Sequence, residues 1–144
     1  MRKRPDMMAQ MLEKLRRNIL AYFMAAQDYG VDMISYADSA GGVNILGPKF
    51  AEGIVRQFTY PLLKDVENNL RAGTLTILCP KTSFALIGTG LARWEDVILP
   101  GTKPVSYGEG CVKLIGRIAF VGQMCIKNHR CMLEGGTIKA LRLL

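Results

Sequence analysis

The chain has 144 residues, 49% of them hydrophobic and 22% charged, a balance that is typical of one globular domain spanning residues 1–144. It contains no apolar run long enough for a membrane helix, and no apolar segment follows its basic start, so we expect neither a membrane span nor a secretory signal. The net charge of +7 is spread without interleaved aromatic residues. A positive net charge suits an anionic small substrate. The absence of a basic stripe with interleaved aromatic residues argues against nucleic-acid binding.

Four cysteines occur at irregular spacings, at positions 79, 111, 125 and 131. Small secreted domains use regular disulfide frameworks, and this pattern is not one of them. We therefore expect a cytoplasmic, reduced protein in which a special cysteine serves chemistry or metal binding.

The first half of the chain reads as helix, strand and helix. Apolar residues at three- and four-residue steps predict a helix from about Pro5 to Tyr29, ended by Gly30. Residues 31–37 predict a strand that ends at Asp38 and enters the glycine-rich loop 39–42. A second helical stripe runs from about residue 47 to Gly73, with a kink or restart at Pro61.

The second half alternates in the same way. We expect strands at 74–79, 96–99 and 118–122, and helices at about 83–91, capped by Ser83, and at about 107–116. The period of residues 137–144 fits a strand and a helix equally well. Strands separated by helices build βαβ units and a parallel sheet. The architecture is either a small open doubly wound sheet or part of a (β/α)₈ barrel, and a complete barrel takes about 250 residues.

Three segments resemble the uroporphyrinogen decarboxylase-like superfamily over about residues 30–126. They are YADSAGGVNILGPKFAEGIVRQFTYPLLKDV, where a strand ends in Asp before a loop and helix, TILCPKTSFAL, and GRIAFVGQMCI. The resemblance implies an α/β fold that is the C-terminal half of a (β/α)₈ TIM barrel. The half has about four βα units and a mostly parallel sheet, and the first four units of the barrel are missing.

The superfamily has two chemistries. One branch decarboxylates the acetate side chains of uroporphyrinogen without a cofactor. The other transfers a methyl group from a methylcobamide carried on a corrinoid protein to a thiol such as coenzyme M, with zinc. The loop around Cys79 is closer to the methyltransferase branch, and nothing resembles the N-terminal arginine segment of the decarboxylases.

Zinc in this family is bound by a His-x-Cys at a strand end and by a later cysteine. The resemblance places Cys79 at the first cysteine and Cys125 at the later one, while Ile77 stands where the family has histidine. A second candidate zinc cluster adds His129 and Cys131, which form a literal His-x-Cys away from the family position. Alternatively, these cysteines are small buried hydrophobic residues, and His129 is simply exposed.

Three further residues are candidates for the site. Asp38 is either a carboxylate that binds substrate or acts as acid or base, or the cap of the turn that follows it. Asn44 is a candidate hydrogen-bond donor to a ligand, and Lys81 a candidate partner for a sulfonate or carboxylate. Both also read as ordinary loop residues.

Together these features predict a methyltransferase of the uroporphyrinogen decarboxylase-like superfamily. The alternatives are the decarboxylase itself, with Asp38 near the pyrroles, and a non-catalytic half-barrel remnant or assembly subunit. Open sheet edges favour association, so we expect a homo-oligomer or a complex with a chain that supplies the other half.

Overall fold

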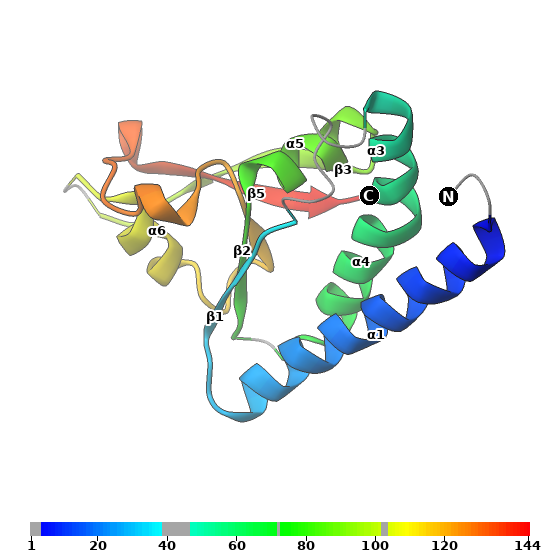
Figure 1. The fold of residues 1–144 in the computed structure, drawn as a ribbon. Helices are drawn as coiled ribbons and strands as arrows, with labels where there is room; N and C mark the ends of the chain where they lie inside the picture. Colours follow the sequence, from blue (N-terminus) through cyan, green and yellow to red (C-terminus); the bar gives the residue numbers. More distant parts are fainter. Residues whose placement is uncertain (1–3, 39–46, 72, 102–103) are drawn as a thin grey trace.

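The computed structural model describes residues 4–38, 47–71, 73–101 and 104–144. In this part of the chain five strands form one open sheet in the order β1-β2-β4-β5-β3 (Figure 1). The strands are β1 (Met33–Tyr36), β2 (Leu75–Leu78), β3 (Ala92–Ile98), β4 (Phe120–Val121) and β5 (Thr137–Leu143). The helices are α1 (Pro5–Asp28), α3 (Pro48–Ile54), the π-helical η1 (Val55–Thr59), α4 (Tyr60–Asn69), α5 (Pro80–Gly88) and α6 (Tyr107–Lys113), with 3₁₀ turns η2 (Ile126–Asn128) and η3 (Glu134–Gly136).

The sheet is mixed. β1, β2 and β4 are parallel neighbours, whereas β5 runs antiparallel to both β4 and β3. The expected α/β class is thus confirmed, with strands β1 and β2 joined through the helical segment 48–69. Consecutive βα units of a half barrel would place β3 between β2 and β4, but β3 lies at the far edge of the sheet beside β5. The half barrel is not confirmed.

The predicted first helix is present as α1. Pro5 occupies its first turn, where a missing N–H costs nothing. At its other end, Gly30 adopts a φ of 79°, and the amides of Gly30 and Val31 donate to the carbonyls of Gln27 and Ala26. This Schellman arrangement ends the helix where the glycine predicts.

The second helical stripe forms one continuous helical segment through α3, η1 and α4. Pro61 lies in the first turn of α4, immediately after the π-helical turn. Proline has no N–H to donate, and its ring crowds the carbonyl four residues earlier. The turn just before it therefore forms hydrogen bonds five residues apart instead of four, as in a π-helix. Tyr60 accordingly donates to the carbonyl of Val55, five residues back. The predicted break at Pro61 is therefore a π-bulge.

The predicted strand 74–79 is present as β2, and all four of its residues are buried. Helix α5 begins at Pro80, earlier than the expected start at Ser83, because Pro80 is a favourable first helical residue. Cys79 therefore takes the N-cap position, and the predicted capping role of Ser83 is wrong: Ser83 lies within the helix.

The C-terminal tail is a strand. β5 pairs along its whole length with β3, which starts at Ala92, earlier than expected. Two exposed ion pairs join these strands: Lys139 binds Asp96 at 2.7 Å and Arg142 binds Glu95 at 2.6 Å. Lys139 lies directly opposite Asp96, whereas Arg142 lies opposite Arg93 and reaches Glu95 diagonally. Ion pairs across two neighbouring strands support this register.

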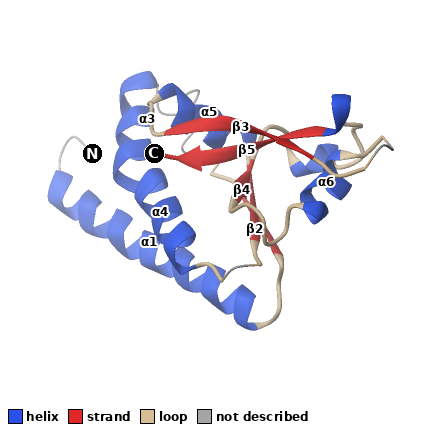
Figure 2. Ribbon diagram, turned by 180° about the vertical axis from the view of Figure 1, so that it is seen from behind, coloured by secondary structure: helices blue, strands red, loops and turns tan. Residues whose placement is uncertain are grey.

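Hydrophobic cores lie on both faces of the sheet. One face packs against α1, η1, α4 and α5, with Phe23, Phe58 and Leu62 among the buried residues. The other packs against α6 and the segments around η2 and η3, with Tyr107 and Leu114 buried. Figure 2 shows α1 and α4 side by side, on the far side of β2 from α6. Among the described residues no helix has the length and apolar character needed to cross a bilayer.

Candidate functional site

Two of the predicted residues leave the sheet at the same edge. β1 and β2 run parallel, with Tyr36 opposite Leu78, and the amide of Cys79 donates to the carbonyl of Tyr36 at 2.9 Å. Asp38 follows two residues after Tyr36, so it leaves the carboxyl end of β1 next to the place where Cys79 leaves β2. Ligand sites of open α/β sheets and of barrels lie at this edge.

Asp38 is half-buried and is held by the π-helical turn. The buried hydroxyl of Thr59 donates to its carboxylate at 3.3 Å. Burial, and in second place the charge of Asp38, raises the pKa of Tyr36 above the usual tyrosine value. Tyr36 therefore stays a neutral phenol beside this carboxylate at any working pH.

Cys79 is half-buried at the N-cap of α5. Its carbonyl accepts hydrogen bonds from the amides of Thr82 and Ser83 at 2.9 and 3.1 Å, which fixes the backbone at the strand end. Lys81 is exposed in the first turn of α5, two residues after Cys79. Lys81 was expected in a loop, and its helical position places the residue at the same end of the sheet.

The residue that follows β4, Gly122, packs closely against β2 and α5. A Cβ built on Gly122 would lie 2.1 Å from the Ser83 hydroxyl oxygen and 3.2 Å from the Leu78 carbonyl oxygen. Only glycine permits this approach. As a result the strand ends of β2 and β4 and the first turns of α5 meet at one place, and the segment that leads to Cys125 starts there.

The second cluster lies over α6. Cys125 is half-buried at the N-cap of η2. His129 is exposed, and its Nδ1 lies 3.2 Å from the Ile126 carbonyl oxygen. The exposed Cys131 uses its carbonyl to accept the amide of Tyr107 at 2.8 Å, which ties this segment to the start of α6.

The candidate zinc ligands do not assemble. Within the described residues no three His, Cys, Asp or Glu side chains are placed so as to hold one ion. The residues outside the description, 1–3, 39–46, 72 and 102–103, include none of these four types. Zinc sites in proteins use three or four protein ligands. The side chains of this chain, as folded here, do not fit a zinc ion held by three of them.

Asn44 lies outside the described residues. Two residues that shape the edge, Thr59 and Gly122, escaped the sequence-based prediction. Pro61 was the sequence signal for Thr59, because a proline inside a helix distorts the turn before it, and Thr59 lies in that turn. Gly122 directly after a short apolar run was a signal for the second, because an isolated glycine there marks close backbone approach.

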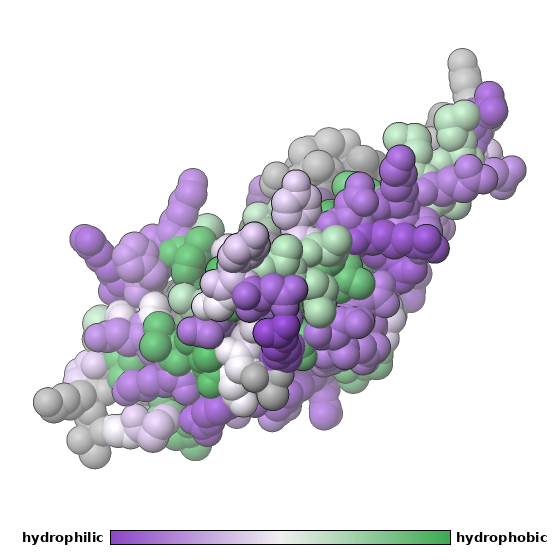
Figure 3. Space-filling view, turned by 90° about the horizontal axis from the view of Figure 1, so that it is seen from below, coloured by the Kyte–Doolittle hydropathy of each residue, from purple (hydrophilic) through white to green (hydrophobic). Residues whose placement is uncertain are grey.

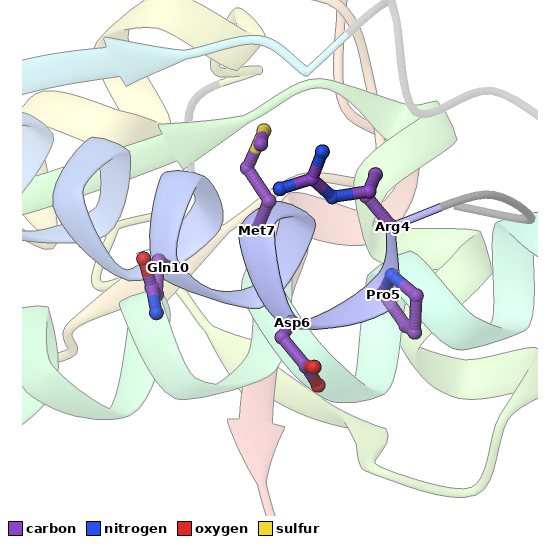
Figure 4. Close-up of a pocket in the computed structure, with 5 residues that line it drawn as sticks. All are labelled: Arg4, Pro5, Asp6, Met7 and Gln10. Carbon is purple, nitrogen blue, oxygen red and sulfur yellow. The ribbon is translucent and has the colours of Figure 1, made fainter.

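A surface hollow among the described residues lies elsewhere. A cavity of about 300 Å³ is lined by Arg4, Pro5, Asp6, Met7 and Gln10, all from the start of α1 (Figure 4). Binding pockets are formed by groups that converge from several elements. A hollow lined by a single helical end gives no such convergence, and we do not assign the site to it.

Comparison with protein-family profiles, with curated proteins and with solved structures gives no match. The functional assignment therefore depends on the geometry of the carboxyl edge and on the sequence resemblance.

Proposed function

We propose that the chain is a uroporphyrinogen decarboxylase-like protein that transfers a methyl group from a methylated corrinoid protein to a small thiol. The observation that carries the proposal is the juxtaposition of Asp38 and Cys79 at the ends of adjacent parallel strands. These are the positions where the quoted motifs end their strands. The exposed ammonium of Lys81 at the same edge suits an anionic thiol that carries a sulfonate or carboxylate.

The chemical step is a nucleophilic displacement. The sulfur of the acceptor thiolate attacks the methyl carbon, a C–S bond forms, and the electron pair of the Co–C bond stays on cobalt. The proton of the thiol has to leave before the attack, since the thiolate is the nucleophile. In this proposal the Asp38 carboxylate, oriented by Thr59, receives that proton or hydrogen-bonds the thiol.

Cys79 lies at this edge and Cys125 lies on the segment that follows β4, and within the described residues no three candidate ligands are placed to hold one ion. The proposed methyl transfer therefore uses only the acceptor thiolate and the Asp38 carboxylate. The parallel strands β1, β2 and β4 support a relation to the C-terminal half of a barrel, although the place of β3 differs from that fold. Within this proposal a second chain covers the open edges and completes the site. A cytoplasmic location is part of it, in keeping with four free cysteines.

The decarboxylase is the second candidate, favoured by the half-buried, hydrogen-bonded carboxylate of Asp38. The two chemistries separate in parallel assays on one preparation. The first follows the absorbance of methylcobalamin with 2-mercaptoethanesulfonate, and the second follows loss of carboxyl groups from uroporphyrinogen. Demethylation of the corrinoid alone supports our proposal. Decarboxylation alone overturns it in favour of the second candidate.

Inactivity in both assays is also informative when the chain is well folded. The assays are then repeated with zinc and with the corrinoid protein added, and metal content is measured by mass spectrometry. A folded chain that stays inactive under all these conditions overturns the enzymatic proposal. It supports the third reading, a non-catalytic assembly subunit.

A further inference from the structure

An exposed apolar stripe runs along the whole of α1. Residues that follow one another at steps of four and three share one face of an α-helix. On α1 this face carries large side chains that are 45–88% exposed: Met7, Met11, Leu15, Tyr22 and Tyr29. Asn18 and Ala25 lie on the same face and are exposed as well. We name these seven residues the α1 stripe.

The core does not need the α1 stripe. The helix packs on η1 and α4 through another face, where Phe23 is buried and Leu12, Ile19 and Leu20 are partly buried. Figure 1 shows the N-terminal end of α1 extending beyond α3 and α4. Figure 3 shows hydrophobic atoms among the hydrophilic ones on this projecting end. Large side chains gathered on an exposed helical face mark an interaction surface.

We propose that the α1 stripe is the interface of a homodimer in which two α1 helices pack antiparallel about a two-fold axis at Asn18. A two-fold interface requires a surface that is complementary to itself. Met7 and Tyr29 lie equally far from Asn18 along the chain, so each thioether meets the partner's ring, a favourable contact. Met11 and Ala25 are likewise equidistant and pair a large side chain with a small one.

Charge favours the same arrangement. The exposed Arg4 stands before α1, and the exposed Asp32 follows it at the same distance from Asn18. Figure 4 shows the Arg4 side chain extending on the same side of the helix as Met7, away from Asp6. An antiparallel pair therefore places the basic end of one helix on the acidic end of the other. The helix dipoles are also opposed favourably.

The polar residue at the centre sets the register. Two Asn18 amides can hydrogen-bond to each other across the axis, and a slip by one turn would leave each of them against apolar side chains. A single central Asn fixes register in this way in paired helices. Two helices of this length bury roughly 1,000 Å², the low end of specific interfaces, so we expect a dimer that dissociates in the micromolar range.

The test is sedimentation of the full chain across the micromolar range, with reductant present because Cys131 is exposed. We expect a concentration-dependent shift from 15.9 kDa to twice that mass. Leu15→Glu places a charge at the centre of the stripe and should weaken the dimer at least tenfold. Ala9→Glu adds the same charge at an exposed position on the opposite face of α1 and should leave it unchanged. Circular dichroism confirms that both variants are folded.

A charge exchange tests the antiparallel arrangement. Arg4→Asp and Asp32→Arg each bring like charges together in a homodimer and should each weaken it, whereas a mixture of the two variants should form a dimer again. A monomer at all concentrations overturns the proposal. Equal effects of Leu15→Glu and Ala9→Glu, or binding of a monomer to phosphatidylserine vesicles through the stripe, overturn it as well.

Discussion

At the scale of single residues, the cysteines differ most in their access to water. Cys111 is fully buried in α6, and burial raises the pKa of its thiol to about 11. Cys79 and Cys125 are half-buried and Cys131 is exposed. Because the thiolate is the reactive form, both access and pKa disfavour reaction of Cys111.

We expect iodoacetamide to modify Cys131 first, Cys79 and Cys125 next, and Cys111 only after unfolding. Peptide mass spectrometry after timed labelling at mildly alkaline pH gives the order. Cys79→Ala should then remove more of the total thiol reactivity of the folded chain than Cys111→Ala does. Equal losses from the two substitutions would contradict the positions described for these residues.

The same burial links stability to alkaline pH. The Cys111 pKa is higher in the folded chain than its ordinary value of 9.0, so the folded state retains a proton that the unfolded state releases. This contribution is complete below pH 9.0 and is lost as the pH rises through about 11. Burial raises the pKa of Tyr107 too, and its effect has the same sign.

Urea denaturation of the wild type should therefore give a free energy of unfolding that falls between pH 9.0 and about 11. In Cys111→Ala the fall over this window should be smaller, since one of the buried groups with a raised pKa is gone while Tyr107 and Tyr36 remain. An identical pH dependence in both proteins would show that the Cys111 thiol is not buried as described.

At the scale of secondary-structure elements, the contact between β4 and α5 organises the candidate site. Gly122→Ala would push a methyl group into Ser83 and the Leu78 backbone. Overpacking of this kind costs about 1–3 kcal/mol. The matched control is Gly53→Ala inside α3, where no atom lies within 4 Å of the new methyl group. There we expect a gain of about 0.5–1 kcal/mol.

Thermal and urea denaturation measure both effects. The opposite signs are the useful result, because the two substitutions make the same chemical change. Stabilisation by Gly122→Ala would mean that β4 does not approach α5 closely, and the convergence of strand ends proposed for the site would be lost.

The elements also show how far local patterns predict this structure. Local signals marked α1, the helix around Pro61, β2 and the candidate pair Asp38 and Cys79 close to their observed places. Period alone left 137–144 open, since its strand state comes from pairing with β3 some 45 residues earlier in the chain. The predicted strand at 96–99 misses the first four residues of β3. The charged residues Arg93, Glu95 and Asp96 interrupt its apolar pattern, and this part is held as a strand by its pairing with β5.

At the scale of the whole molecule, β5 decides between the observed sheet and a half barrel. It lies between β4 and β3, and Ile138, Ala140 and Leu141 are buried on it. Sequence order could not reveal this, because pairing partners in a sheet depend on contacts distant along the chain. Without β5, β3 has no strand to pair with in the described sheet.

Deleting residues 137–144 should therefore abolish cooperative unfolding and leave β3 open to proteolysis. Circular dichroism melting and limited trypsin digestion of the truncated and full-length chains measure this. A truncated chain that melts like the full one would show that β3 pairs with another strand. It would favour the sequential order of a half barrel over the mixed sheet.

We propose above that Asp38 and Cys79, which leave the adjacent parallel strands β1 and β2 at their carboxyl edge, belong to a methyl-transfer site. The most direct measurement is the rate of methylcobalamin demethylation with 2-mercaptoethanesulfonate for wild type, Asp38→Asn, Cys79→Ala and Cys111→Ala. We predict that Asp38→Asn lowers the rate by about 10²-fold, as expected for loss of a general base. Cys79→Ala changes a side chain at the same edge that takes no part in the proposed proton transfer, so it should lower the rate less than Asp38→Asn does, whereas Cys111→Ala should retain the wild-type rate. Equal rates in all four folded proteins would contradict the claim.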